Sequence, residues 1–409
     1  MHKTKTLDNG LRVVAKKLEG TQAVTVLILC GAGSRYEEQG NRGISHFLEH
    51  MFFKGAKKYG NAKAVSEAID GIGGESNAFT GKEYAGYYVK VASPHLETAA
   101  DVLSDMLLNA KFDSADIERE RGVILEEYNM YQDTPMYQIG WDFEHLVFGD
   151  QPMGWDQIGT KKLIREVTHD DFVKYKGELY TADNCVVAVV GNIDADEAFS
   201  LIEGKFKFGA EKKGRIFEPF TEGLSDRAEN LHKKKTEQAH LVCGAQGISE
   251  NDDDHFAMQV LSVVLGGGMS SRMFQSVREE KGLCYYVRTN TDDYTDCGII
   301  STSAGVDIKR VDEALAAIKE EYAGVREKDV PKAELQKAKE YMKGKIVLRL
   351  EDSEEMAHLL SKYYLLYGEV RTAEEVIKAI DAVKAEDLRR VAKELLAEDR
   401  LKTAVIGPC

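Results

Sequence analysis

The residues of this sequence with the clearest capacity for chemistry lie in the stretch GNRGISHFLEHMFFKG, which begins at Gly40. Within it, His46 and His50 are four residues apart, so on a helix their side chains share one face. Two neutral imidazoles at that spacing can bind one Zn²⁺, each at about 2.0–2.1 Å. Glu49 faces nearly the same way, and its carboxylate can take a proton from a water that the metal activates. The pattern predicts a zinc ion held on a helix, with Glu49 as the general base.

The flanking residues favour a metal site over a chance match. Such a string also arises by chance in a chain with 10 His and many Glu. Here, however, the three polar residues are surrounded by apolar ones: Ile44, Phe47, Leu48, Met51, Phe52 and Phe53. A helix that is apolar nearly all round is buried, and buried His and Glu side chains cost free energy unless they have partners. A metal ion and its water would satisfy all three.

A second helix is predicted to begin near Asp113 or Ser114, either of which is a suitable N-cap. Glu120 and Glu127 are seven residues apart on that helix, so they share a face. The adjacent Glu126 points about 100° away and is interpreted as a solvated or salt-bridged side chain.

The motif H-x-x-E-H is that of the inverzincins, and the sequence around it resembles the pitrilysin family. The resemblance is to the half-sized branch that includes the mitochondrial processing peptidase and bacterial processing proteases. In that family the third metal ligand is a Glu at a characteristic distance beyond the motif, and Glu127 stands at that distance after His50. The segment ERERGVILEEYN, from Glu118, also matches. The resemblance implies a zinc metalloendopeptidase with one Zn²⁺ per chain, held by His46, His50 and Glu127. It also implies that Glu120 orients a His ligand or tunes the metal.

The segment GIGGESNAFTGKEYAGYYVKV, from Gly71, is predicted to be a Gly-rich turn followed by a strand. In the family this segment is an edge strand to which a peptide substrate adds through backbone hydrogen bonds. Asn77 and Ala78 match the family's Asn-Ala pair, so the resemblance makes them substrate-binding residues, with Asn77 holding a substrate carbonyl. From the residues alone, an ordinary strand of the sheet remains an alternative.

The second half lacks the H-x-x-E-H motif and instead contains QVLSVVLGGGMSSRMFQSVREEKGLCYYV, from Gln259. It resembles the family's C-terminal signature, in which an Arg and a Tyr seven residues later contact the bound peptide. Arg278 and Tyr285 match this pair, so the resemblance implies that Arg278 grips a peptide carbonyl. The Tyr285 hydroxyl is then expected to stabilise the oxyanion. A salt bridge from Arg278 to Glu279 or Glu280 on a helix surface is an equally good interpretation.

The chain contains an internal duplication. The segment from Val167, VTHDDFVKYKGELYTADNCVVAVVGN, aligns without gaps and at a constant offset with VKAEDLRRVAKELLAEDRLKTAVIGP from Val383. Each copy predicts a helix, a turn and an apolar strand. We therefore predict an α+β protein with two tandem homologous domains, each a mixed β-sheet with helices packed on one face. The expected boundaries are 1–215 for the zinc-binding domain, 216–232 for a linker and 233–409 for a substrate-contacting domain without a metal.

The composition argues against a nucleic-acid partner and a membrane-spanning segment, and it favours a cytoplasmic location. A formal net charge of −15 argues against a nucleic-acid partner, and no apolar run is long enough to span a membrane. None of the six cysteines forms a Cys-x-x-Cys pair, which indicates reduced, buried thiols and a cytoplasmic location.

A peptide is the expected substrate. The family's full-length enzymes close a chamber with four such units, whereas this chain has two. A homodimer, or a heterodimer with a homologous subunit, is therefore expected. The alternative function is a non-catalytic structural or regulatory subunit of a processing-peptidase-like complex, because the fold includes such members. Those members typically lack the ligands that this sequence retains.

Overall fold

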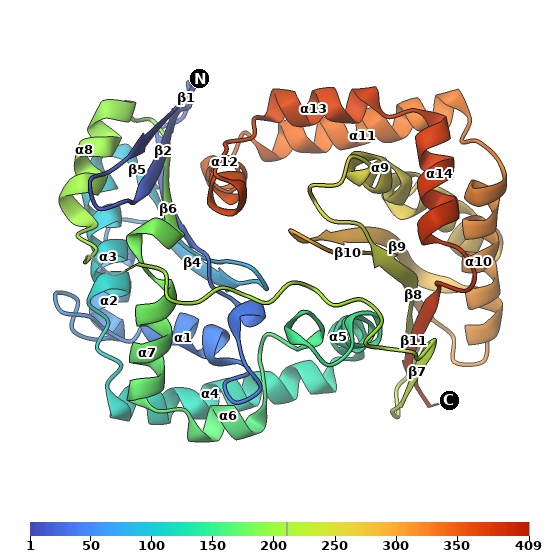
Figure 1. Ribbon diagram of the computed structural model, residues 1–409, viewed down its shortest axis with the longest axis horizontal. Coiled ribbons are helices and arrows are strands. Elements are labelled where there is room, and N and C mark those ends of the chain that lie inside the picture. The colour runs from blue at the N-terminus through green and yellow to red at the C-terminus, as the bar shows by residue number, and fades with distance from the viewer. Residues whose placement is uncertain (210–211, 409) are drawn as a thin grey trace. The chain divides into compact units, whose positions relative to one another are not determined.

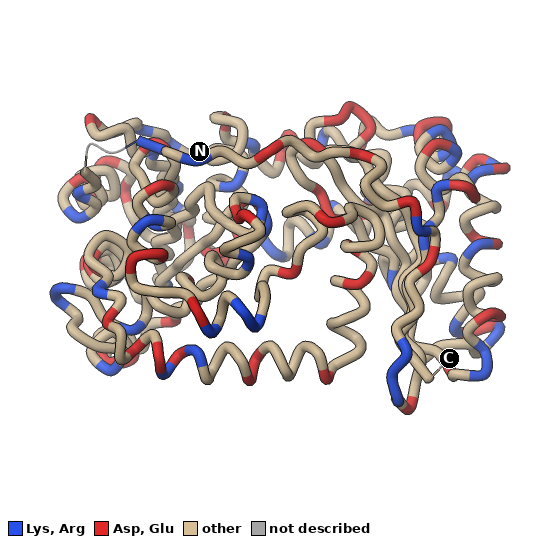
Figure 2. Tube along the Cα trace, turned by 60° about the horizontal axis from the view of Figure 1, so that its bottom comes forward, with Lys and Arg blue, Asp and Glu red and all other residues tan. Residues whose placement is uncertain are grey.

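The computed structural model describes residues 1–209 and 212–408; Cys409, one of the cysteines considered above, lies outside this part. The described residues form two compact units. Unit 1 comprises Met1–Tyr128, Asp156–Glu218 and Leu348–Thr372. Unit 2 comprises Asn129–Trp155, Pro219–Val347 and the segment from Ala373 onward. No helix in the described part is both long enough and apolar enough to cross a bilayer. Figure 2 shows Lys and Arg interspersed with Asp and Glu along the chain.

Unit 1 is built on a mixed six-stranded sheet in the order β1-β2-β6-β3-β5-β4. Its strands are β1 (His2–Thr6), β2 (Arg12–Lys17), β3 (Ala23–Cys30), β4 (Glu75–Thr80), β5 (Ala85–Ala92) and β6 (Cys185–Gly191). Only β2 and β6 pair in parallel. The helices of this unit that come from the first half are α1 (Ile44–Phe52), α2 (Ala62–Asp70), α3 (Leu96–Leu108), most of α4 (Ser114–Asp133), α6 (Lys161–Glu166), α7 (His169–Leu179) and α8 (Ala195–Lys205). Of these, α3 packs on β3 and β5, and α8 on β2.

The opposite face of this sheet is covered by α12 (Ser353–Tyr367), a helix from the second half of the chain. Strand residues that alternate with those facing α3, such as Leu27 and Ala188, form an apolar cluster with Met356 and Leu360 of α12. Lys90 of β5 forms an ion pair with Asp352, just before the helix, at 2.6 Å. Figure 1 shows α12 across the strands from α3. Burial of this strand face is therefore completed by a distant segment.

Unit 2 has a five-stranded mixed sheet in the order β7-β11-β8-β10-β9. Its strands are β7 (Glu229–Lys233), β8 (Ala239–Gly247), β9 (Cys284–Asp293), β10 (Gly298–Val306) and β11 (Lys402–Gly407). One face packs against α9 (His255–Gly266), α10 (Val311–Glu327) and α14 (Ala385–Leu395), with α11 (Lys332–Arg349) and α13 (Ala373–Ala382) beside them. The other face packs against α5 (Pro135–Phe148), which comes from the first half of the chain.

The predicted α+β class and the mixed sheets are confirmed, and so is the duplication. Helices α7 and α14 begin and end at positions that the aligned segments pair, His169 with Ala385 and Leu179 with Leu395. The strands that follow them, β6 and β11, hold equivalent places in the two sheets. The compact units do not divide at 216–232 alone, however. Each sheet also carries one helix from the other half, α5 or α12, on the face that its own helices leave uncovered.

Candidate metal centre

Helix α1 carries His46, Glu49 and His50, and its first turn is fixed by two residues before it. Gly43 has φ 99°, and a Cβ there would lie 2.6 Å from the carbonyl oxygen of Ile158, so only Gly fits. The buried Glu37 carboxyl accepts hydrogen bonds from the backbone N–H groups of Gly43 (2.7 Å) and Ser45 (2.9 Å). These are donors that the start of a helix otherwise leaves unpaired.

The apolar side of α1 is buried in unit 1. Phe47 packs edge-on against Phe172 of α7, with ring centroids 5.1 Å apart. Phe52 packs against Tyr87 of β5 at 5.2 Å. Because Phe47 and Phe52 are packed in this way, the two histidines of the helix lie on its other side. Their side chains remain partly exposed, 15% for His46 and 22% for His50. The sequence's apolar flanks therefore orient the metal-binding face.

Helix α4 supplies the two predicted acids. Its buried residues are Ile117, Glu120 and Ile124, which recur at helical spacing. Glu127 continues this row three residues after Ile124. Arg121 on the same helix donates to the carbonyl oxygen of Ile164 at 2.6 Å, which ties α4 to α6. Glu120 and Glu127 share a face of α4, as their spacing predicts, and the structure turns that face toward α1.

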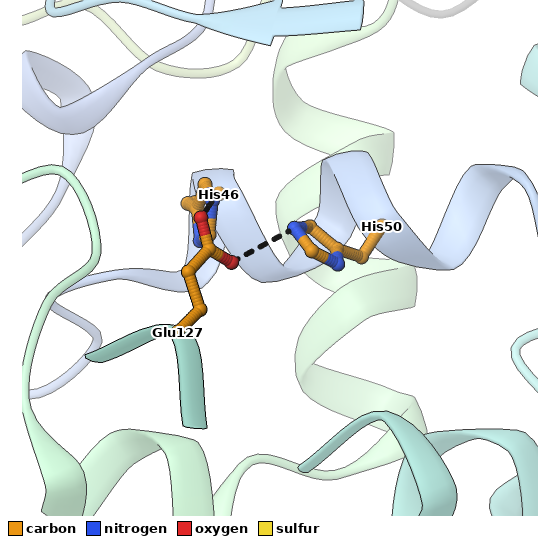
Figure 3. Close-up of side chains that lie close together, drawn as sticks. All are labelled: His46, His50 and Glu127. Atoms are coloured by element: carbon orange, nitrogen blue, oxygen red, sulfur yellow. Dashed lines mark ion pairs between the residues drawn. The ribbon is translucent and has the colours of Figure 1, made fainter. Parts of the chain in front are cut away.

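His46, His50 and Glu127 meet in one group. Each offers a ligand atom, and these atoms all lie within 4.8 Å of one another. His46 Nε2 is 3.6 Å from one carboxylate oxygen of Glu127, and His50 Nε2 is 3.5 Å from the other. Figure 3 shows the Glu127 carboxylate between the two imidazole rings. Residues separated by a long stretch of sequence therefore converge as the resemblance implies.

The separations between Glu127 and the two histidines fit a zinc ion. Ligand atoms held tetrahedrally at about 2.0–2.1 Å from Zn²⁺ are about 3.3–3.4 Å from one another. The two nitrogen–oxygen separations of 3.6 and 3.5 Å are close to that value. Both exceed the usual length of an N–H···O hydrogen bond, about 2.7–3.2 Å. Two imidazoles with one carboxylate are a donor set that zinc accepts.

Glu120 holds the outer side of the His50 ring. Its Oε1 is 2.9 Å from His50 Nδ1, and its Oε2 is 2.6 Å from Lys54 Nζ. Burial raises the pKa of Glu120, but the contacts with His50 and Lys54 outweigh burial and leave the pKa below its usual value. An anionic Glu120 accepts the proton of Nδ1, which leaves the Nε2 lone pair toward Glu127 and the metal position.

Glu49 is positioned from the sheet. The Thr80 hydroxyl of β4 donates a hydrogen bond to Glu49 Oε2 at 2.5 Å. Helix α1 also packs on β4, so the expected base, the metal ligands and the end of this strand lie in one place. Thr80 and Lys54 are two contributors that sequence analysis did not identify. Thr80 follows Asn77 and Ala78 in the matched segment, and Lys54 is four residues after His50, yet neither position reveals its partner.

The segment with Asn77 and Ala78 is an edge strand, since β4 ends the order of the sheet. The Gly81 N–H bonds to the Tyr84 carbonyl in the hairpin that joins β4 to β5. Antiparallel pairing alternates, so Ser76, Ala78 and Thr80 direct their backbone groups to the free edge. The Asn77 side-chain oxygen accepts from the Ala78 N–H at 2.9 Å.

Arg278 and Tyr285 belong to unit 2. Arg278 lies in the short helix η5 (Phe274–Glu280), with its guanidinium 4.6 Å from the ring centre of Phe274 and 5.8 Å from that of Tyr285. Tyr285 is 76% exposed. The alternative salt bridge of Arg278 is present but long, with 3.8 Å between its Nε and Glu279 Oε1.

Known proteins resemble both halves of this chain. Residues 12–145, which include His46, Glu49, His50 and Glu127, match the family model described as Insulinase (Peptidase family M16). Residues 166–342 match the model described as Peptidase M16 inactive domain. A protein of Streptomyces coelicolor is 36% identical over 98% of this chain and 89% of its own length. One of Bacillus subtilis is 36% identical over 100% of this chain and 98% of its own length. Both are named as uncharacterized zinc proteases.

Solved structures give the same result for the fold. A protease from Helicobacter pylori superposes with a TM-score of 0.92 and 25% identity, over 100% of this chain and 99% of that one. A chain of complex III from Candida albicans has a TM-score of 0.84 at 18% identity, over 99% of this chain and 96% of that one, which shows the shared fold alone. With the site residues inside the matched segment and relatives that align from end to end, the chain belongs to peptidase family M16.

Proposed function

We propose that this protein is a zinc-dependent endopeptidase that hydrolyses extended, unfolded peptides. The observation that carries the proposal is the position of Glu49. It lies on the helix of His46 and His50, and it is hydrogen-bonded to Thr80 at the end of a strand with a free edge. A peptide bound along that edge would be brought to the base and to the metal ligands together.

The free edge of β4 suits an extended peptide. The backbone groups of Ser76 and Thr80 and the carbonyl of Ala78 face this edge, where a substrate strand can pair with them, which selects extended shape rather than particular side chains. Because the Asn77 side-chain oxygen is bonded to the Ala78 N–H, its amide nitrogen is the group left to donate to a substrate carbonyl. This is the role we assign to Asn77.

The reaction is hydrolysis of a peptide bond. A zinc ion held by His46, His50 and Glu127 would polarise the scissile carbonyl and make a water ligand more acidic. Glu49 takes a proton from the attacking water, while its orientation is maintained by the Thr80 hydroxyl. As the carbon–nitrogen bond breaks, Glu49 returns that proton to the leaving amine.

The remaining roles are proposals that rest on the family. Arg278 grips a peptide carbonyl and Tyr285 stabilises the oxyanion, with the exposed Tyr285 hydroxyl free to do so. A second chain, identical or homologous, completes a chamber around the substrate. Residues 1–215 supply the metal ligands and the edge strand, and residues 233–409 supply further contacts to the substrate. The buried Cys30 and Cys185, whose sulfur atoms are 3.2 Å apart as free thiols, suit a reducing cytoplasm.

Metal content and turnover test the proposal together. The intact chain is expected to contain one zinc by mass spectrometry, and His50→Ala and Glu127→Ala are expected to lose it. Glu126→Ala is the matched control, because Glu126 is adjacent to Glu127 but exposed. Glu49→Gln should keep the zinc and lose nearly all cleavage of an internally quenched peptide.

The alternative function, a non-catalytic subunit, predicts a different result. An intact chain that holds no zinc after gentle purification, or that cleaves no peptide from a diverse extended set, would support that alternative. Substantial cleavage by Glu49→Gln would show that the assignment of the base is wrong.

A further inference from the structure

Lys54 is joined to the metal centre through a single buried carboxylate. Its Nζ is 2.6 Å from Oε2 of Glu120, and the other oxygen of Glu120 is 2.9 Å from His50 Nδ1. Glu120 is only 5% exposed, whereas 27% of the Lys54 side chain is exposed. The three side chains therefore form a chain of contacts in which one oxygen of Glu120 meets Lys54 and the other meets His50.

The backbone places Lys54 for this contact. Its N–H donates to the carbonyl oxygen of Met51 at 3.1 Å, which continues the last turn of α1 past Phe52. Lys54 is four residues after His50, so both side chains lean toward α4 on the same side of the helix. Its ammonium group also lies at the negative end of the helix dipole, where a cation is favoured.

A buried carboxylate needs a partner of opposite charge. Without Lys54, one oxygen of Glu120 would be left without a donor at this depth, and the carboxylate would turn toward water. That turn would remove the acceptor that holds the Nδ1 proton of His50. The neutral imidazole could then carry its proton on Nε2, the nitrogen that must face the metal without one.

We infer that Lys54 is a positioning residue of the metal centre. By holding Glu120, it keeps the His50 ring oriented with Nε2 free to bind the ion. The inference rests on the proposed function only for the identity of the ion as zinc, because the contacts among Lys54, Glu120 and His50 are made by the protein alone.

The sign of the effect separates positioning from simple repulsion. If Lys54 acted only as a nearby positive charge, it would oppose the binding of a cation, and its removal would tighten zinc binding. If Lys54 acts through Glu120, its removal weakens zinc binding despite the lost repulsion. Loss of an outer partner of a ligand typically costs about 10- to 100-fold in metal affinity.

The experiment compares Lys54→Met with Lys54→Arg, and with Lys57→Met as the matched control, since Lys57 is exposed three residues away. The zinc dissociation constant is measured by competition with a chelating dye. In the metal-free proteins, the neutral tautomer of His50 is read by long-range ¹H–¹⁵N NMR, with the His50 signals assigned from a His50→Gln spectrum.

We expect Lys54→Met to weaken zinc binding at least about tenfold, toward the lower end of the range for such partners, and to increase the share of His50 protonated on Nε2. Lys54→Arg should recover most of the affinity, because Arg keeps the charge and the donors. Lys57→Met should match the unaltered protein. Unchanged or tighter zinc binding in Lys54→Met, or an unchanged His50 tautomer, would overturn the inference. A protein that binds zinc but cleaves no peptide would instead overturn the proposed function and leave this inference standing.

Discussion

The hydrogen bond from Thr80 to Glu49 makes a precise prediction about catalysis. Replacement of Thr80 by Val removes the hydroxyl and keeps a β-branched side chain of nearly the same shape. The edge strand should retain its pairing with β5, since Thr and Val have similar preferences for strands. The metal ligands lie on α1 and α4 and make no contact through this hydroxyl, so zinc content should not change. The change therefore acts on the orientation of the base.

The magnitude follows from the kind of bond that is lost. The Thr80 hydroxyl donates to the Glu49 carboxylate at 2.5 Å, and a hydrogen bond to a charged group contributes about 1.5–3 kcal/mol. If all of that free energy serves to hold Glu49 in its reactive orientation, kcat falls by about one to two orders of magnitude. Water can replace part of the bond at this partly exposed position, so we expect a value near the lower limit, about tenfold.

The assay is steady-state cleavage of one internally quenched peptide by the unaltered protein, Thr80→Val and Thr80→Ser. Thr80→Ser is the matched control, because it keeps the hydroxyl and should keep kcat within about twofold to threefold, the scatter expected of a conservative change. Zinc is quantified in each sample. Equal kcat in Thr80→Val and the unaltered protein would refute the reasoning, and so would a loss of zinc that accounts for the change.

Three further predictions concern the metal, helix α12 and the start of α1. Removal of zinc with a chelator should abolish cleavage and leave the helical circular dichroism intact. The melting temperature should also fall, because bound zinc stabilises the folded state by an amount that grows with the logarithm of the ratio of free zinc to its dissociation constant, about 2.7 kcal/mol at a ratio of 100. Leu360→Ala should lower the free energy of unfolding, measured by urea denaturation, by about 2–5 kcal/mol, because Leu360 is 1% exposed against the sheet. Leu348 is 70% exposed and serves as the control, since Leu348→Ala should change that free energy by under about 0.5 kcal/mol. Burial raises the pKa of Glu37 to about 8, although backbone donors oppose the rise. The folded state therefore keeps a proton that the unfolded state releases near pH 4.3. The free energy of unfolding should thus decrease as the pH rises from about 5 to 8. Glu37→Gln should flatten that decline, and equal slopes in both proteins would contradict the assignment.

The parts of the site that the sequence predicts are those set by spacing within one element. His46 and His50 share a face because they are four residues apart, and Glu120 and Glu127 do so because they are seven apart. The convergence of the two helices is a different matter. Neither periodicity nor composition indicates that α4 meets α1, and only the family resemblance connected Glu127 with the histidines before the geometry did.

Contacts between elements are what sequence reasoning missed. Thr80 and Lys54 are ordinary residues by type, and each becomes informative only through the carboxylate that it meets across the fold. Lys54 follows α1 while its partner lies on α4, and Thr80 ends β4 while its partner lies on α1. A hydrogen-bond donor has many acceptors within reach of any compact arrangement, so its type alone cannot select one.

Each sheet is covered on one face by a helix from the other half of the chain, α5 or α12, and this arrangement has a physical cause that the duplication does not reveal. The strands of both sheets are apolar on both faces: in β6, for example, every residue from Cys185 to Gly191 is buried. A duplicated unit with helices on one face would leave the other face of such strands in water, at a cost of about 25 cal/mol for each Å² of apolar surface. Helix α12 covers that face in unit 1, and α5 does so in unit 2. The continuous apolar runs were therefore a sign that each sheet needs a second helical layer. The aligned segments from Val167 and Val383 show only that the two sheets are built alike. They do not contain the helix that completes either sheet, and for that reason a boundary placed between the repeats does not separate the two cores.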